Sequence, residues 1–449
     1  MPIASSATVS PAYERLAGTF RRLHHLEHLQ SLAYWDQAAM MPGGGAQARA
    51  SALAEVAALM HGLRTDPSMK DDLARAADEP LSEHQRANLR EIGREWRAAN
   101  ALPPALVQRS QLATSRCEHA WRQQRPANDW AGFLVNFREV VAVAREEAVL
   151  LSSSTGLRPY DALMDRFEPG MRCAQLDPLF ADLRTWLPAL VQQVRARQQH
   201  DTVIQPVGPF PIECQRQLCL QVMQWLGFDF NHNRLDVSTH PFAGGSPEDV
   251  RLTTRYETGE FITSLLGAIH ETGHGRYEQN RPRDWLDQPV SLARSMGIHE
   301  SQSLSFEMQL GRHPGVIAHL SPMICQAFGD QPALAPDNLL KLVTRVRPGL
   351  IRVDADELTY AAHVMLRYGI ERRLIEREIE ADDVPALWDQ GMAELLGQDT
   401  RGNYRDGPMQ DVHWPEAMFG YFPCYTLGAM YAAQWFATMW REQPSLDAD

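Results

Sequence analysis

Two histidines four residues apart, His270 and His274, form the pair of side chains with the clearest chemical meaning in this sequence. On an α-helix, side chains at positions i and i+4 project from nearly the same face, one turn apart. Both imidazoles could therefore bind one metal ion. Glu271 lies about 100° around the helix from His270, where a carboxylate reaches a water on the ion but is poorly placed to bind the ion itself. The spacing therefore predicts a metal centre with Glu271 as the general base of a hydrolysis reaction.

The surroundings of this motif favour a helix that carries a metal site. With 16 histidines in 449 residues, the His-Glu-x-x-His spacing arises by chance in roughly a few per cent of sequences, so the context must decide. Residues 261–269 are mostly apolar, and no proline follows the motif until Pro282. Two imidazoles and a carboxylate suit Zn²⁺ and leave a fourth position for a water whose pKa falls to about 7. We therefore expect one Zn²⁺ per chain, with Co²⁺ or Mn²⁺ as alternatives that the same ligands accept.

A third protein ligand must come from elsewhere in the chain. The extended metzincin motif needs glycine and histidine at positions that Tyr277 and Asn280 occupy here, which excludes that class. The other common solution is a glutamate on a second helix. Glu300 lies in a helical run, residues 291–310, that follows a loop around residues 280–289. Two antiparallel helices would bring Glu300 back to the histidines.

Two other glutamates are close enough in sequence to compete with Glu300. Glu278 lies four residues after His274 on the same helical face, and Glu307 lies two turns beyond Glu300. We expect each of them to orient a ligand or to lie on the surface instead.

The sequence predicts that the elements positioning these residues are mainly helices. Apolar residues recur at three- and four-residue spacing through most of the chain, for example in residues 81–102, 128–151 and 358–379. Proline and glycine clusters separate these runs at intervals typical of turns. Residues 425–440 are the most apolar late stretch, but Gln434 interrupts them and they are shorter than the roughly 20 residues of a membrane span. We predict a buried helix there.

One segment, residues 234–256, has a different pattern. Valine and threonine recur at short spacing in two runs, residues 235–242 and 249–256, and Gly244-Gly245-Ser246-Pro247 lies between them. The pattern predicts a β-hairpin or two strands of a small sheet. Because the segment ends just before the helix of the metal motif, the sheet should border the active centre.

Composition limits the partners and the compartment. The formal charge of -13 argues against a nucleic-acid groove or an anionic membrane surface, because both partners are polyanions that a basic face must neutralise. Peptides or small molecules fit better. The six cysteines form no CxxC pair, which is typical of free thiols in a reducing compartment. The first twenty residues lack the basic and apolar regions of a secretory signal. We therefore expect a cytoplasmic protein.

Beyond the metal motif, the sequence resembles the carboxypeptidase Taq family of zinc metallocarboxypeptidases of the HExxH type. Six signatures of that family occur in order, and the resemblance spans roughly residues 30–440. The opening run Trp35-Asp36-Gln37 with Met41-Pro42 is also similar. The signatures are His240-Pro241-Phe242, Asp249-Val250-Arg251-Leu252-Thr253, the metal motif, His299-Glu300-Ser301-Gln302, Ile351-Arg352-Val353-Asp354-Ala355-Asp356 and Gly407-Pro408-Met409-Gln410-Asp411-Val412-His413-Trp414.

The resemblance implies a fold and an assembly. It implies a mainly α, single large metallopeptidase domain, residues 1–449, with a deep active-site groove and a small β-sheet beside the helix of the metal motif. An N-terminal helical part of about residues 10–200 would cover the groove, and residues 201–440 would form the catalytic part. It also implies a homodimer.

The resemblance further implies an activity and its ligands. His270, His274 and Glu300 would bind the metal and Glu271 would be the base, in agreement with the spacing. The substrates would be peptides with a free C-terminus, from which single C-terminal amino acids are released.

A carboxypeptidase must recognise a terminal carboxylate, and a guanidinium that offers two parallel hydrogen bonds is the strongest device for that task. Arg352 is the first choice, just ahead of a helix expected to begin near residues 354–356, whose free amides would add positive potential. The alternative is an ion pair with Asp354 or Asp356. Arg251 is the second choice, although pairing with Asp249 is equally compatible with its position.

Other polar residues are candidates for stabilising the reaction or holding the peptide. The oxyanion formed by attack on a peptide carbonyl needs a donor besides the metal. Tyr421 is the candidate, because Gly420 and Pro423 predict a fixed loop there. His240 and His413 are possible further donors. A last group, which would orient the ligands or hold substrate, comprises Gln410, Asp411 and His299.

Three hypotheses follow. The first is a metallocarboxypeptidase in which Glu271 deprotonates the attacking water and passes the proton to the leaving amine. The second is an oligopeptidase or aminopeptidase with the same metal centre. The third is a catalytically inactive metal-binding scaffold, against which the intact Glu271 argues.

Overall fold

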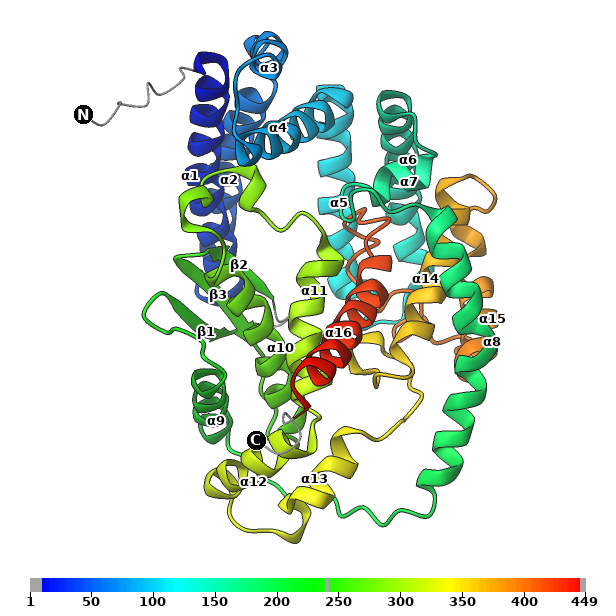
Figure 1. Cartoon of the computed structure of the whole chain (residues 1–449). Coiled ribbons are helices and arrows are strands. Elements are labelled where there is room, and N and C mark those ends of the chain that lie inside the picture. Colours follow the sequence, from blue (N-terminus) through cyan, green and yellow to red (C-terminus); the bar gives the residue numbers. More distant parts are fainter. Residues whose placement is uncertain (1–9, 239–241, 445–449) are drawn as a thin grey trace, which may run out of the picture. The chain divides into compact units, whose positions relative to one another are not determined.

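Helices make up most of the chain, as the apolar spacing predicted, in a computed structural model that describes residues 10–238 and 242–444. Local sequence explains where they begin and end. At the start of α6, Asp129 accepts a hydrogen bond from the amide of Gly132 at 2.8 Å, and Gly156, with φ of 75°, ends the helix. In chain order, the α-helices are α1 (Pro11–Ala39), α2 (Ala46–Arg64), α3 (Ser68–Ala77), α4 (Glu83–Ala101), α5 (Pro104–Gln124), α6 (Trp130–Thr155), α7 (Pro159–Met164), α8 (Cys173–Gln198), α9 (Ile212–Trp225), α10 (Ile262–Gln279), α11 (Met296–Leu304), α12 (Pro314–Phe328), α13 (Pro336–Val343), α14 (Tyr360–Ile375), α15 (Val384–Leu396) and α16 (Pro423–Glu442) (Figure 1).

The chain passes several times between two compact units. The predicted N-terminal and catalytic parts, divided near residue 200, do not coincide with these units, because each unit takes segments from both sides of that residue. Unit 1 takes its described residues from 10–101, 224–256 and 274–293, and unit 2 from 102–223, 257–273 and 294–444.

Unit 1 has its apolar core among helices α1 to α4. The fully buried Asn88 of α4 connects this core to the loop that follows α10. Its amide donates to the hydroxyl of Tyr13 at 3.0 Å and to Gln288 at 2.8 Å, and its carbonyl oxygen accepts from the amide of Val290 at 3.1 Å. Because a buried amide is costly unless its hydrogen bonds are made, this network fixes the loop on the helices.

Unit 1 also contains a three-stranded sheet of β1 (Asn233–Val237), β2 (Ala243–Ser246) and β3 (Asp249–Thr254) in the order β1-β3-β2. The two predicted runs contribute strands β1 and β3 to one sheet, but a hairpin between them is wrong, because these strands pair parallel. The hairpin is formed by β2 and β3, so residues expected in the turn form a strand. The turn is only Pro247 and Glu248. The glycines permit this register: a Cβ on Gly245, which has φ of 96°, would lie 2.0 Å from the carbonyl oxygen of Asp249.

The sheet borders the helix of the metal motif, as predicted. A Cβ on Gly275 of α10 would lie 2.4 Å from the ring of Phe228 and 3.3 Å from the side chain of Leu252 in β3. Only glycine allows this close approach of the helix to the sheet.

Unit 2 is built from the remaining helices, around a core rich in aromatic residues. Phe137 of α6, Trp388 of α15 and Trp414 stack or meet edge to face with ring centroids 5.9–6.0 Å apart. The predicted apolar helix at residues 425–440 is α16, and it packs along α11 and α14 (Figure 1). None of the described helices is both long and apolar enough to cross a membrane.

Candidate metal centre

The His-Glu-x-x-His motif lies on α10, as its spacing predicted. His270 and His274 are one turn apart on this helix, and Glu271 and His274 are buried. The hydroxyl of Thr272, inside the motif, donates to the carbonyl of Ala268 at 2.6 Å, so it satisfies its hydrogen bond within the helix. The two imidazoles are therefore held by a regular helix.

Glu300 lies on α11 and completes the triad. One donor atom each from His270, His274 and Glu300 lie within 4.8 Å of one another, and Nε2 of His270 is 4.0 Å from Oε1 of Glu300. A single divalent cation can draw donors at this spacing together. The predicted second helix and connecting loop are both present, although the helical run begins at Met296 rather than near residue 291.

Two glycines allow the helices around Glu300 to approach closely. A Cβ on Gly273, inside the motif, would lie 2.4 Å from the carbonyl oxygen of Gln302 and 2.6 Å from Cα of Ser303 on α11. On the other side of α11, a Cβ on Gly428 of α16 would lie 2.9 Å from Cβ and Cγ of Glu300. The backbones of α10, α11 and α16 are thus in direct contact, which fixes the glutamate relative to His270.

A buried glutamate that the motifs did not mark anchors the start of α11. Ser295 caps this helix by accepting from the amide of Ile298 at 2.9 Å. Glu168 accepts from the hydroxyl of Ser295 at 2.7 Å and from the amide of Gly297 at 2.9 Å. Negative charge and acceptors at a helix N-terminus are stabilising. Nothing in the spacing of Glu168, over 120 residues away in sequence, indicated this role.

Glu307 orients His270 from the opposite side of the ring. Oε2 of Glu307 lies 2.9 Å from Nδ1 of His270, and Arg312 donates to Oε1 of Glu307 at 2.9 Å. Because a carboxylate accepts a hydrogen bond from Nδ1–H, this contact leaves the lone pair on Nε2 free for a metal. Glu307 reaches the histidine from a wide π-helical turn, Ser305–Leu310, that follows α11. The other rival, Glu278, pairs with Arg281 at 2.9 Å.

The electrostatics of the site suit a cation. Burial lowers the pKa of His270, but its hydrogen bond to Glu307 and the charges of Glu300, Glu307 and Glu271 raise it to about 10. Burial raises the pKa of Glu271 to about 7. Among the described residues, none forms a hydrogen bond with Oε2 of Glu271. The buried carboxyl groups of Glu271 and Glu300 and the partly buried one of Glu307 therefore surround the imidazoles, which fits a divalent cation and a water beside it.

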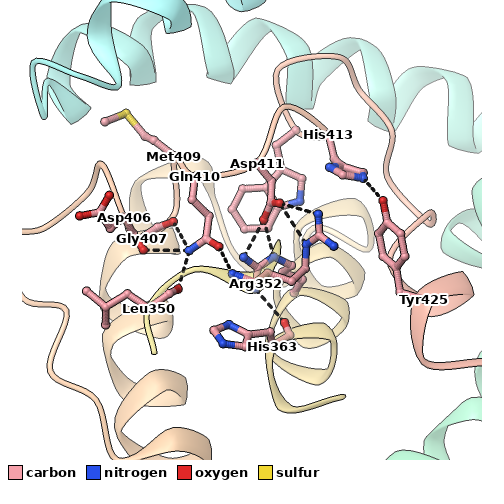
Figure 2. Close-up of polar contacts among 12 residues, drawn as sticks. Leu350, Arg352, His363, Asp406, Gly407, Met409, Gln410, Asp411, His413 and Tyr425 are labelled. Carbon is pink, nitrogen blue, oxygen red and sulfur yellow. Dashed lines mark hydrogen bonds and ion pairs between the residues drawn. The ribbon is translucent and has the colours of Figure 1, made fainter. Parts of the chain in front are cut away.

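Arg352 lies in a buried ion cluster rather than in a pair with its sequence neighbours. Its Nε and Nη2 donate to Oδ1 of Asp411 at 3.0 and 2.9 Å (Figure 2). Its Nη1 donates to the hydroxyl of Tyr360 at 3.3 Å. Arg367 donates from Nε to Oδ2 of the same aspartate at 2.7 Å. Burial opposes ionisation of Asp411, but the two guanidinium groups hold its pKa well below its usual range. Two guanidinium groups therefore share the carboxylate of Asp411.

Asp356, one of the alternative partners of Arg352, has another role. Asp356 accepts hydrogen bonds from the amides of Leu358 and Thr359 at 3.1 and 3.0 Å, in the turn before α14. That helix begins at Tyr360, later than expected, because these capped turns precede it.

Gln410 and His413 lie beside this cluster. The side-chain oxygen of Gln410 accepts from the amide of Arg352 at 2.8 Å, and its nitrogen donates to the carbonyls of Leu350 and Asp406 at 2.9 and 2.8 Å (Figure 2). Nε2 of His413 lies 2.9 Å from the hydroxyl of Tyr425. Burial, together with the positive charge of Arg352, lowers the pKa of His413 to about 3, which keeps the ring neutral.

Tyr421 lies in a non-helical turn directly before α16, as its glycine and proline neighbours predicted. Its half-buried ring meets His413 and Tyr425, with centroids 5.5 and 5.3 Å apart, and Phe167 at 5.1 Å. The loop therefore brings together the rings of Tyr421 and His413, which are eight residues apart in the sequence.

The remaining candidates are Arg251, His240 and His299. In unit 1, Arg251 donates from Nη2 to Asp249 at 2.9 Å, the pairing weighed as an alternative, and its guanidinium lies 4.5 Å from the ring of Trp35. His240 lies outside the described residues. His299 is on α11 beside Glu300, and its charge lowers the pKa of Glu271, against the larger effect of burial.

Comparison with known proteins gives a consistent result. The model of the family described as carboxypeptidase Taq (M32) metallopeptidase matches residues 15–449. Thermostable carboxypeptidase 1 of Thermus thermophilus is 37% identical over 441 residues, which cover 96% of this chain and 86% of the relative. Carboxypeptidase 1 of Bacillus subtilis is 34% identical over 432 residues, covering 95% of this chain and 86% of the relative.

Solved structures agree. Metallocarboxypeptidase 1 of Trypanosoma cruzi has a TM-score of 0.95 at 46% identity, over 98% of this chain and 89% of that one. A carboxypeptidase of Pyrococcus furiosus, described as Apo-Mg, has a TM-score of 0.91 at 30% identity, over 98% of this chain and 88% of that one.

Proposed function

Because the chain belongs to the carboxypeptidase Taq (M32) family of metallopeptidases, we propose that it removes single C-terminal amino acids from peptides with one Zn²⁺ bound to His270, His274 and Glu300. The membership makes it a metal-dependent exopeptidase, and the triad is its candidate metal site. Zinc is proposed because two imidazoles and a carboxylate are its preferred ligands in hydrolases. Co²⁺ and Mn²⁺ are the expected substitutes.

The bound cation would lower the pKa of a water and polarise the scissile carbonyl. Glu271 is placed to take the proton from that water, because it follows His270 on the helix and its Oε2 has no hydrogen-bond partner among the described side chains and backbone. Its buried carboxyl, with a pKa raised to about 7, can then return the proton to the leaving amine. Glu307 keeps His270 in the tautomer that binds metal, through the 2.9 Å contact at Nδ1.

The observation that supports the exopeptidase assignment at named residues is that two buried guanidinium groups, of Arg352 and Arg367, share the carboxylate of Asp411. A terminal carboxylate would be a further anion for this cluster, and Arg352 would bind it by charge-assisted hydrogen bonds. Tyr421 and the neutral His413 are proposed as hydrogen-bond donors to the same substrate. Gln410, whose side-chain amide makes its hydrogen bonds within the protein, would act by holding the backbone of Arg352.

A digest of a defined N-blocked peptide tests this function. With a free C-terminus, mass spectrometry should show a ladder shortened from the C-terminal end. The same peptide as its C-terminal amide should be degraded far more slowly, because it lacks the carboxylate. Internal cuts, or a ladder shortened from the N-terminus of an unblocked peptide, would instead indicate the oligopeptidase or aminopeptidase alternative.

The homodimer remains a prediction. Light scattering coupled to size exclusion should give twice the 50.6 kDa mass of one chain. A mass of one chain at micromolar concentration would contradict it.

A further inference from the structure

Helix α14 carries two fully buried charged residues, Arg367 and Glu371, one turn apart. The sequence signatures assigned neither a role. Charged side chains are almost never fully buried unless they are paired, because removing a charge from water is costly. Both make their contacts with the segment that runs from Asp411 to Tyr421.

Glu371 holds both ends of the loop between Trp414 and Gly420. Its Oε1 accepts from Nε1 of Trp414 at 2.8 Å, and its Oε2 accepts from the amide of Gly420 at 3.0 Å. The hydroxyl of Tyr160, on α7, donates to Oε2 at 2.9 Å. All three groups donate to the carboxylate of Glu371, so both of its oxygens accept hydrogen bonds.

The backbone at Gly420 is fitted to this contact. Gly420 has φ of +90°, and a Cβ there would lie 2.7 Å from the backbone nitrogen of Met164 and 2.8 Å from its Cα. The loop is therefore pressed against the residues at the end of α7, with its amide directed at Glu371. A side chain at this position would push the loop away.

Arg367 holds the preceding part of the same segment. Its Nε and Nη2 lie 2.7 and 2.6 Å from Oδ2 of Asp411, and its Nη1 donates to the carbonyl of His363 at 2.9 Å. Asp411 is two residues before His413, and Figure 2 shows both residues near Arg352. One face of α14 thus fixes the segment at Asp411, Trp414 and Gly420.

We propose that Glu371 is a positioning residue of the peptidase reaction: it fixes the loop from Trp414 to Gly420 so that His413 and Tyr421, which flank the loop, face the substrate together. His413 is directly before Trp414, Tyr421 is directly after Gly420, and their rings lie 5.5 Å apart. A bond at each end of the loop is what sets this separation. The inference rests on the proposed role of Tyr421 and His413 as donors to the substrate.

The test is Glu371→Gln, compared with Tyr160→Phe. Glutamine keeps the size of the side chain, but its amide nitrogen faces an N–H donor of Trp414 or Gly420, so one end of the loop is released. We expect kcat to fall about tenfold or more, since small misplacements of catalytic groups have effects of this size, with zinc content at wild-type level. Tyr160→Phe removes a donor from the same carboxylate and leaves both loop bonds, so it should lower stability and leave kcat near wild type.

A double-mutant cycle with Tyr421→Phe separates positioning from simple destabilisation. If Glu371 acts partly through Tyr421, adding Glu371→Gln to Tyr421→Phe should lower kcat by a smaller factor than Glu371→Gln does alone. Effects that multiply in full, or a wild-type kcat for Glu371→Gln, would overturn the inference. If Tyr421→Phe by itself retains full kcat, the proposed role of Tyr421 fails, which is a distinct result.

If Glu371→Gln does not fold, Trp414→Phe replaces it in both measurements. This change removes only the bond to Oε1 and keeps an aromatic ring in the core. A reduced kcat that does not multiply with Tyr421→Phe supports the inference, and an unchanged kcat contradicts it.

Discussion

At the scale of single residues, the site depends on which partner each of its charged side chains has. Glu307 has His270 as its partner, Asp411 is shared by Arg352 and Arg367, and Glu271 is buried beside the imidazoles without a protein partner on Oε2 among the described residues. A buried carboxyl without a partner is costly, so its retention is better explained by a water and a cation than by packing.

Glu271→Gln should remove the base and leave the ligands in place. We expect kcat to fall by about 10²–10⁴, the range typical of a general acid–base group, with bound zinc unchanged. Hydrolysis of the N-blocked peptide and metal analysis of the same sample provide the measurement. Loss of both activity and zinc would show that Glu271 holds the site rather than acting on water.

Arg352→Lys tests how the terminal carboxylate is recognised. Lysine keeps the charge near Asp411 but loses the planar pair of donors. We expect kcat/KM for the free peptide to fall about tenfold to hundredfold, corresponding to roughly 1.4–2.8 kcal/mol, and the preference over the amide to shrink. Arg251→Lys is the matched control and should behave as wild type. If Arg251→Lys loses the preference instead, the assignment passes to Arg251.

At the scale of elements, glycines decide where α10, α11 and α16 can meet. Gly273 faces the backbone of α11 at distances that exclude a Cβ, and Gly428 faces the Cβ and Cγ of Glu300. Because these glycines have no side chain, α10 and α16 pack closely on α11 from two sides and so fix the position of Glu300, the third ligand.

Gly428→Ala should displace Glu300, because the new Cβ would lie 2.9 Å from that side chain. We expect zinc affinity to fall about tenfold or more, as for other changes that disturb how a ligand is held. Competition with a chelator of known affinity measures it. Gly369→Ala on α14 is the control, since nothing lies within 4 Å of its Cβ. It should keep the affinity and gain roughly 0.5–1 kcal/mol of stability from helix propensity. Equal affinities for the two variants would contradict the packing argument.

At the scale of the whole molecule, metal binding should be coupled to stability. A ligand that binds only the folded state adds about 2.7 kcal/mol when its free concentration is one hundred times Kd. Removal of the metal with a chelator should abolish hydrolysis and lower Tm, and added Zn²⁺ should restore both. Glu271→Gln should show the same change in Tm, because it keeps the ligands. His274→Ala should show little change, and a full change in that variant would place the stabilising site elsewhere.

The sequence by itself determined the features that depend on local periodicity. The helical character of most of the chain, the His-Glu-x-x-His helix and the apolar helix near the C-terminus follow from spacings of three and four residues, which one element expresses alone. The ordered signatures also identified the family correctly. Within the candidate site, Glu300 could be predicted as the third ligand, because a short loop and a second helix bring the chain back to the histidines.

Only the tertiary structure decided how distant elements pair. The contact of Glu307 with His270 depends on the wide turn after α11, and the ion pairs of Asp411 join residues more than 40 positions apart. Residues Ala243–Ser246 form a strand because they pair with β3, whereas their glycines had predicted a turn. Glu168, Arg367 and Glu371 have no local signal, since a charged residue on a helix resembles a solvated one until packing buries it. Spacing along one element reports which groups share a face, whereas packing between elements selects their partners.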